Sequence, residues 1–175
     1  MEPITSVDDL VTLLARGARV RDEPELDGLA HALQCAAILR AEHPDDSELA
    51  LAGLVHDISD IAHPDDHTDH DRRGAVLVAP LLGPRVARLV GAHVLAKRYL
   101  VTTDPAYRSR LSARSIETLA AQGDALADAE LAALAADPDR DAILALRRAD
   151  ERAKDPAARV PDLESWRTLL ADVAR

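Results

Sequence analysis

Apolar residues recur at helical spacing along most of the chain. Ser6 is a suitable N-cap for the first amphipathic stretch, and Pro or Gly stands near several later boundaries. The predicted helices cover residues 8–17, 29–41, 48–55, 72–81, 85–99, 112–121, 128–136, 139–154 and 163–174. The polar segments 21–27, 59–71 and 102–110 are predicted as loops. No alternating run of β-branched residues appears, so the predicted fold is all-α.

Length, composition and charge narrow the class of protein. The chain has 175 residues, which is enough for one domain with its own core. Its net charge is −10 and no basic run stands out, so we expect no binding to nucleic acid. No segment approaches the roughly 20 consecutive apolar residues of a membrane span, and acids stand where a signal peptide carries basic residues. The sequence therefore indicates a cytoplasmic protein without a membrane segment, and it indicates no obligate protein partner.

Several polar residues interrupt apolar helices. They are His31, the adjacent pair His56–Asp57, His93 and Asp150. A buried His or Asp needs a partner, and both a shared metal ion and ordinary core hydrogen bonds supply one. The pattern leaves these two interpretations open. The single cysteine, Cys35, excludes a Cys-based site, so a metal would be held by nitrogen and oxygen donors, which suit Fe, Mn, Mg or Zn. His70 adds a donor, and the two oxygens of Asp57 are able to bridge two ions.

Six segments carry a more specific signal. They are HALQCA from residue 31, LAGLVHDI from 51, HDRRGA from 70, RVARLVGAHVLAKRYL from 85, LSARSIETLAAQG from 111 and LRRADERAK from 146. Together they resemble the HD-domain superfamily, and in particular its mixed-valent di-iron oxygenases that cleave 1-hydroxyphosphonates. The resemblance implies a single HD domain over 1–175, built as a helical bundle around a dinuclear metal site. Its metal-site core would cover about 27–154, and a C-terminal helix within 161–175 would dock on it.

The resemblance implies two iron ions, as a mixed-valent Fe(II)/Fe(III) pair. The implied ligands of one ion are His31, His56, Asp57 and Asp150. The implied ligands of the other are Asp57, His70 and His93. In such relatives the metal pair and O2 break the carbon–phosphorus bond of a small phosphonate and release phosphate and a carboxylate.

The resemblance also implies a set of substrate contacts. The residues at the matching positions are Lys97, Ser115, Thr118 and Gln122. Lys97 and Lys154 are the only lysines, and each stands four residues after an implied ligand, which is one helical turn. The sequence leaves open that Ser115 is a solvated helix residue and that Lys154 pairs with Glu151 or Asp150.

This chain departs from these relatives at two positions. The relatives carry a His four residues after the His of the His–Asp pair, where this chain has Asp60. We expect Asp60 to hydrogen-bond a neighbouring group or to bind a cationic part of the substrate. The relatives also carry a Tyr and a Glu in the loop before the first implied ligand. In this chain Glu23 matches that Glu, and the Tyr is missing. The catalytic residues implied are Asp57, Lys97 and Glu23. His63 and His67 are expected to be solvated.

Two other functions stay open at this stage. One is a metal-dependent phosphohydrolase, the activity of most HD domains, in which Mn, Mg or Zn activates water against a small phosphate ester. The other is a protein that binds metal and a phosphorylated ligand without turning it over. In all three interpretations the ligand is a small phosphonate or phosphate.

Overall fold

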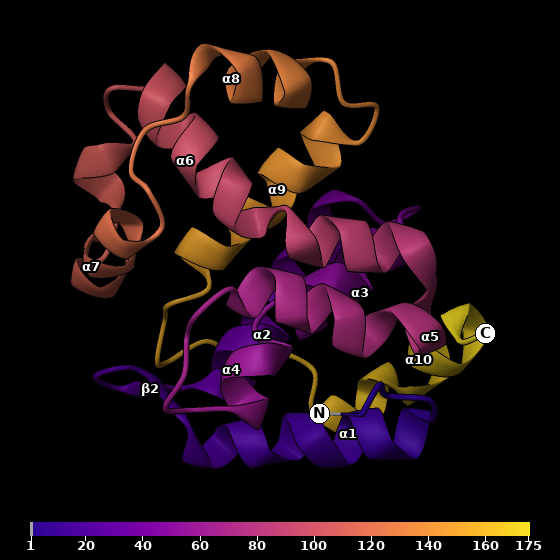
Figure 1. Ribbon diagram of the computed structural model, residues 1–175. Coiled ribbons are helices and arrows are strands. Elements are labelled where there is room, and N and C mark those ends of the chain that lie inside the picture. The colour runs from indigo at the N-terminus through magenta and orange to yellow at the C-terminus, as the bar shows by residue number, and fades with distance from the viewer. Residues whose placement is uncertain (1) are drawn as a thin grey trace.

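Helices form most of the molecule (Figure 1). The computed structural model describes residues 2–175, apart from the side chains of Asp22 and Glu23. Within these residues the β structure is limited to two very short strands. The all-α prediction is therefore confirmed.

The first helix begins where the sequence predicts. α1 covers Val7–Arg16, and the Ser6 hydroxyl accepts a hydrogen bond from the N–H of Asp9 at 3.1 Å. This contact satisfies one of the free N–H groups of the first turn, which is why the helix starts here. A 3-10 turn over Gly17–Arg19 follows.

Two segments predicted as loops contain short elements. Within 21–27, strand β1 (Arg21–Glu23) pairs antiparallel with strand β2 (Leu26–Asp27). Within 59–71, helix α4 covers Ile58–Ala62 and buries its isoleucines. Elements this short hold too few residues to show a helical or alternating period, so the loop predictions are wrong at these places.

The two central helices agree with their predicted ranges to within one residue. α2 covers Gly28–Glu42 and α3 covers Ser47–Val55. The side chains of Asp27 and Asp46 cap their first turns. α3 is buried from residue 49 to its end, as its almost uniformly apolar sequence predicts.

Helix α5 covers His70–Gly91 and is kinked at Gly83. Gly83 has a φ of 82°, in the left-handed region that favours glycine, so the predicted break between 81 and 85 is confirmed. The segment His70–Thr103 is long and apolar enough for one membrane crossing, but half of its apolar window is buried inside the molecule. A buried core helix of a soluble protein has the same composition, so we base no membrane assignment on it.

The prediction of one continuous helix over 85–99 is wrong. Ala92 (φ −106°, ψ −2°) ends α5, and α6 begins anew over His93–Thr103. Nδ1 of His93 bonds the carbonyl of Val90 at 2.7 Å, and a continuous helix would offer that carbonyl to the N–H of residue 94. The break therefore comes from a side chain that competes with the helical hydrogen bonds, and no Pro marks it.

The C-terminal half follows the predicted helices. Its helices are α7 (Ala113–Ala121), α8 (Asp128–Ala135), α9 (Arg140–Arg152) and α10 (Arg167–Val173). Its 3-10 turns are Arg108–Arg110 and Leu163–Trp166. The predicted loop 102–110 contains the last residues of α6 and the first of these turns.

The helices pack around α2 and α3 (Figure 1). α3 lies against α2 and α5, and α9 lies against α2 and α6. α10 packs on α3 and α1, close to the N-terminus (Figure 1). This arrangement brings ends of α2, α3, α5, α6 and α9 to one region, which holds the candidate site.

Candidate metal centre

The six predicted metal ligands lie together where these helix ends meet. They are His31 on α2, His56 and Asp57 between α3 and α4, His70 and His93 at the starts of α5 and α6, and Asp150 on α9. Asp57 has a φ of −102° and a ψ of 21°, so the chain leaves the helical path between the two members of the His–Asp pair. The bend lets two adjacent side chains occupy different positions in the cluster.

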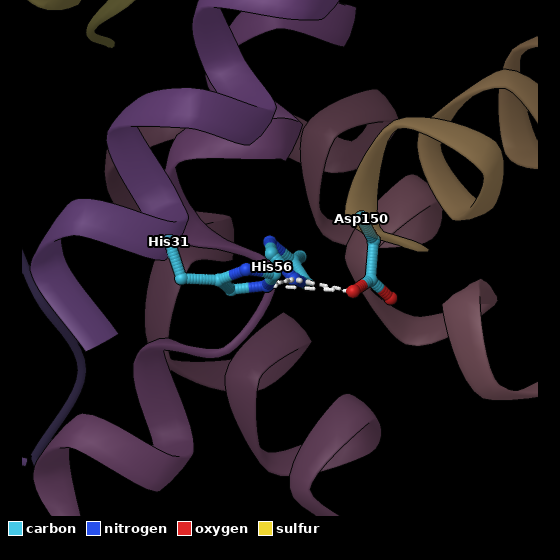
Figure 2. Close-up of side chains that lie close together, drawn as sticks. All are labelled: His31, His56 and Asp150. Carbon is cyan, nitrogen blue, oxygen red and sulfur yellow. Dashed lines mark hydrogen bonds and ion pairs between the residues drawn. The ribbon is translucent and has the colours of Figure 1, made fainter. Parts of the chain in front are cut away.

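His31, His56 and Asp150 form a first group, whose ligand atoms lie within 4.8 Å of one another (Figure 2). Nε2 of His31 is 3.1 Å from Nε2 of His56 and 3.4 Å from Oδ1 of Asp150. Nε2 of His56 is 3.9 Å from the same carboxylate oxygen. All three side chains are buried, so their polar atoms are shielded from bulk water.

Asp57, His70 and His93 form a second group, whose ligand atoms also lie within 4.8 Å of one another. The two Nε2 atoms are 3.0 Å apart, and Oδ1 of Asp57 is 3.8 Å from that of His70 and 3.5 Å from that of His93. Oδ2 of Asp57 lies 3.3 Å from Nε2 of His56 and 3.8 Å from Nε2 of His31. One oxygen of Asp57 therefore faces each group.

Each of the four imidazoles is held through Nδ1 by a backbone carbonyl. The carbonyls of Ala153, Gly53, His67 and Val90 lie 2.9, 2.9, 3.2 and 2.7 Å from Nδ1 of His31, His56, His70 and His93 respectively. A carbonyl only accepts, so Nδ1 carries a proton, and in its neutral form each ring has its lone pair at Nε2. The two Nε2 atoms of each group face each other, at 3.1 Å and 3.0 Å. That arrangement is unfavourable unless a proton or a metal ion lies between them.

The two carboxylates make the cluster favourable for a positive charge. Burial opposes the charge on His56, but Asp57 and Asp150 outweigh it and raise the pKa of His56 to about 10. Burial also opposes the charge on both carboxylates. Nevertheless, His56 holds the pKa of Asp57 well below its usual range, and Arg147 does the same for the pKa of Asp150. A cation in the cluster would thus meet two carboxylates that are already ionised.

The donor set fits two metal ions. Burial and the neighbouring His70 lower the pKa of His93 to about 3, so the His93 ring is neutral and has a lone pair to offer. Donor atoms about 2.1 Å from one ion lie about 3.0–3.4 Å apart at octahedral or tetrahedral angles. The separations in the two groups run from 3.0 to 3.9 Å. Imidazole nitrogen with carboxylate oxygen suits iron, manganese or zinc.

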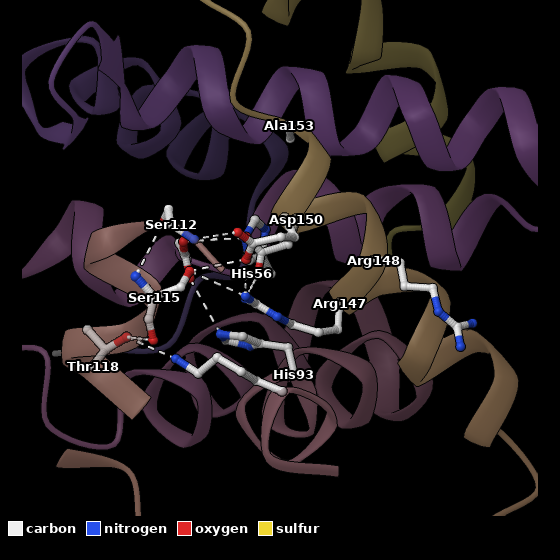
Figure 3. A network of polar contacts seen from close by, with 12 residues as sticks. His56, His93, Ser112, Ser115, Thr118, Arg147, Arg148, Asp150 and Ala153 are labelled. Carbon is white, nitrogen blue, oxygen red and sulfur yellow. Dashed lines mark hydrogen bonds and ion pairs between the residues drawn. The ribbon is translucent and has the colours of Figure 1, made fainter. Parts of the chain in front are cut away.

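Arg147 forms an ion pair with Asp150 that fixes this carboxylate (Figure 3). The sequence-based prediction of the site did not include Arg147. It is 4% exposed, contacts Oδ2 of Asp150 and Oε2 of Glu151, and donates from Nε to the Tyr107 hydroxyl at 2.8 Å. Because Oδ2 of Asp150 is engaged, Oδ1 is left to face the imidazoles. The sequence contains a signal for Arg147, since a residue three positions before a predicted ligand shares its helix face. The adjacent Arg148 is exposed and points away (Figure 3).

A cavity of about 620 Å³ lies beside both groups. Its lining includes the cationic side chains of Lys97, Arg114, Arg147 and Lys154. Lys97 is 4% exposed, and its Nζ donates to Oγ1 of Thr118 at 2.9 Å. Burial, helped by the charge of Arg147, lowers the pKa of Lys97 to about 8. A buried ammonium that bonds a neutral hydroxyl is well suited to binding an anion in the cavity.

The three polar residues predicted on one helix face line the same cavity, Ser115 and Thr118 from α7 and Gln122 from directly after its end. Ser115 is buried, not solvated, and its hydroxyl donates to Oε2 of Glu151 at 3.2 Å. Lys154 donates to Ser115 at 3.2 Å and lies 3.4 Å from Oε1 of Glu151, which is the pairing that the sequence left open. Oε1 of Gln122 is buried without a hydrogen-bond partner among the described residues. Thr118 and Gln122 thus join Lys97 at the cavity, whereas Lys154 is paired.

Asp60 lies on α4 and also lines the cavity. Burial, with the negative charge of Asp57, raises the pKa of Asp60. Oδ2 of Asp60 is 3.1 Å from Nδ1 of His67. His67 is 42% exposed, as a solvated residue is, but its ring is engaged by this contact. The predicted side chain of Glu23 lies outside the part that the structure describes.

The chain is similar to known proteins over most of its length. The family described as HD domain matches residues 28–133. Hydroxymethylphosphonate dioxygenase of Gimesia maris is 33% identical over 177 residues, which cover 95% of this chain and 86% of that protein. [1-hydroxy-2-(trimethylamino)ethyl]phosphonate dioxygenase (glycine-betaine-forming) of Leisingera caerulea is 33% identical over 140 residues, which cover 75% of this chain and 71% of that protein.

Proposed function

This chain belongs to the HD-domain family, and from that premise we propose that it is a di-iron oxygenase that cleaves the carbon–phosphorus bond of a 1-hydroxyphosphonate. Both similar proteins carry the name of a phosphonate dioxygenase. The observation that carries the proposal is the position of Asp57, which directs one oxygen toward each of two donor groups beside a cavity with a buried lysine.

The proposed ligands follow from this geometry. One iron would be held by His31, His56, Asp150 and Oδ2 of Asp57. The second would be held by His70, His93 and Oδ1 of Asp57. Bound as a mixed-valent Fe(II)/Fe(III) pair, the metals would supply the redox chemistry with O2 that protein side chains lack. The facing Nε2 atoms support this assignment, because they converge on positions that a cation would occupy.

The protein's own residues would bind and orient the substrate. Lys97 would contact the phosphonate with its ammonium, and Thr118, which already bonds that ammonium, would hold it toward the cavity. Ser115 and Gln122 line the same cavity and would supply further contacts. An anion beside Lys97 would offset the burial that disfavours its charge, so the site gains most when the ligand carries a negative group. With Asp57 and Lys97, Glu23 remains a proposed catalytic residue on the basis of the sequence.

The proposed reaction balances with O2 as the only oxidant. The C1–H and C–P bonds of the substrate break, and new C–O and P–O bonds form with one atom of O2 each. C1 is oxidised by four electrons and O2 is reduced by four. The products are a carboxylate, phosphate and one proton.

The test combines metal analysis with turnover. Protein purified with iron should contain two iron ions per chain and give a coupled Fe(II)Fe(III) signal in low-temperature EPR. It should release phosphate from hydroxymethylphosphonate or from 1-hydroxy-2-(trimethylamino)ethylphosphonate only when O2 is present. His93→Ala should abolish the release, whereas His63→Ala, in a loop outside both donor groups, should retain it.

Other outcomes would contradict the proposal. Release of phosphate from phosphate esters without O2 would support a phosphohydrolase that uses Mn, Mg or Zn. Metal and phosphate binding without turnover of either class would support a binding protein.

We extend the proposal to organisation and location. We propose one HD domain over 1–175, with its metal-site core over about 27–154 and its C-terminal segment 161–175 docked. The packing of α10 on α1 and α3 supports the docking. The cytoplasmic location, and a small phosphonate and O2 as partners, rest on the sequence and on the resemblance.

A further inference from the structure

One side-chain contact ties the loop between α4 and α5 back to α4. Oδ2 of Asp60 is 3.1 Å from Nδ1 of His67. The Asp60 side chain is 15% exposed and that of His67 is 42% exposed, so the contact joins the cavity wall to the surface. The N–H of Asp60 donates to the carbonyl of Asp57 at 2.9 Å. The backbone of Asp60 is therefore fixed relative to the residue that faces both metal groups.

His67 also touches the second metal group, through its backbone. Nδ1 of His70 donates to the carbonyl of His67 at 3.2 Å. That bond sets the tautomer and the plane of the His70 ring, whose Nε2 lies 3.0 Å from Nε2 of His93. Two contacts in series thus run from Asp60 through His67 to His70.

The turn that makes the second contact is strained. Asp69, directly before His70, has a φ of 47° and a ψ of 34°, in the left-handed region that residues other than glycine seldom adopt. Such a conformation persists only where its surroundings hold it. Asp66 and Arg73 hold the outer side of the loop with an ion pair at 2.7 Å.

We propose that Asp60 is a positioning residue of the second metal centre, because it holds the inner side of this loop and so keeps the His67 carbonyl against His70. The proposal rests on the two-metal centre proposed above and not on the reaction. It gives Asp60 a role other than contact with the substrate. Without its carboxylate the strained turn relaxes and the His70 ring is free to rotate. The other proposed ligands of the first centre lie on α2, directly after α3 and on α9, so they do not depend on this loop.

The probe is Mn²⁺ alone, titrated into the full chain while EPR reports the free ion. Loss of a residue that orients a metal ligand costs about 10–100-fold in metal affinity. Asp60→Ala and His67→Ala should each raise the Kd of one Mn²⁺ by about that factor and leave the other within about threefold. The double variant should be no worse than either single variant, because both remove the same contact.

Two further variants separate positioning from general damage. Asp60→Asn keeps an oxygen that accepts from Nδ1 of His67, so it should bind both ions within about threefold of the unmodified protein. His63→Ala removes a histidine of the same loop that belongs to neither donor group, and it should change nothing.

Equal weakening of both ions in Asp60→Ala, unchanged affinities, or failure of Asp60→Asn to restore binding would overturn the proposal. If the unmodified chain binds fewer than two Mn²⁺, the two-metal centre and this inference both fall. If the unmodified chain binds two Mn²⁺ and Asp60→Ala leaves both affinities unchanged, only this inference falls.

Discussion

Replacing Lys97 by methionine should make the protein more stable and at the same time less able to bind phosphate. Lys97 is 4% exposed, and burial with the nearby Arg147 lowers its pKa to about 8. A charged side chain that the folded protein disfavours lowers the stability of the folded state unless a bound ligand compensates for its charge. Methionine has a similar length and no charge, so it removes this destabilisation and fills the same space.

The magnitude follows from the pKa. A fall from 10.5 to about 8 corresponds to about 3 kcal/mol of cost for holding the ammonium charged at neutral pH. The lost hydrogen bond to Thr118 offsets about 1 kcal/mol of that. The net gain is about 2 kcal/mol, or about 4–8 °C in Tm for a domain of this size.

The sign of the pH dependence is also determined. Between pH 8 and 10.5 the unfolded chain binds the proton of Lys97 and the folded chain does not, so the stability of the unmodified protein rises with pH across this window. The advantage of Lys97→Met is therefore full below pH 8 and disappears as pH approaches 10.5. Urea denaturation of both proteins, loaded with the same metal, measures it.

Binding provides the second half of the test. Loss of a charge-assisted contact should weaken the affinity for inorganic phosphate by ~1.5–3 kcal/mol, or about 10–150-fold, in isothermal titration calorimetry. Lys154→Met is the matched control, because this lysine is paired with Glu151 and bonds Ser112 at 3.0 Å. It should destabilise the protein by about 1 kcal/mol. A Lys97→Met protein that is less stable than the unmodified one, or that binds phosphate equally well, would refute the reasoning.

Three further outcomes are expected. Asp57→Ala should lower the metal content from two ions per chain toward one or none, and unchanged stoichiometry in elemental analysis would contradict the bridging role. Above pH 8 phosphate affinity should fall about tenfold per pH unit as Lys97 loses its proton, and calorimetry of Lys97→Met should show no such fall. Arg147→Met removes the guanidinium that pairs with two buried carboxylates and should cost about 3–5 kcal/mol in urea denaturation, whereas Arg148→Met should stay within about 0.5 kcal/mol. Equal effects of the two arginine changes would argue against the buried network.

Periodicity and residue type predicted most of the helices and the residue types that gather in the candidate metal centre. The spacing of apolar residues predicts α2 and α3 to within one residue, because burial of one helix face leaves a local record in the sequence. Histidines and acids that interrupt such helices mark positions where a buried polar group needs a partner. The resemblance of six segments to a known family then indicated the order of the predicted ligands. The break at Ala92 was hidden, because a side chain and not a backbone propensity causes it.

Only the tertiary structure decided which polar groups meet. His31 and Ala153 are 122 residues apart in sequence, yet the ring of one bonds the carbonyl of the other. The contact between Asp60 and His67 and the bond from Arg147 to the Tyr107 hydroxyl, 40 residues away, have no local signature either. A sequence pattern shows that a side chain faces inward, but the partner it finds depends on how helices distant in the chain pack. That is why the residue types in the candidate metal centre were predictable from the sequence, and the long-range contacts that position them were not.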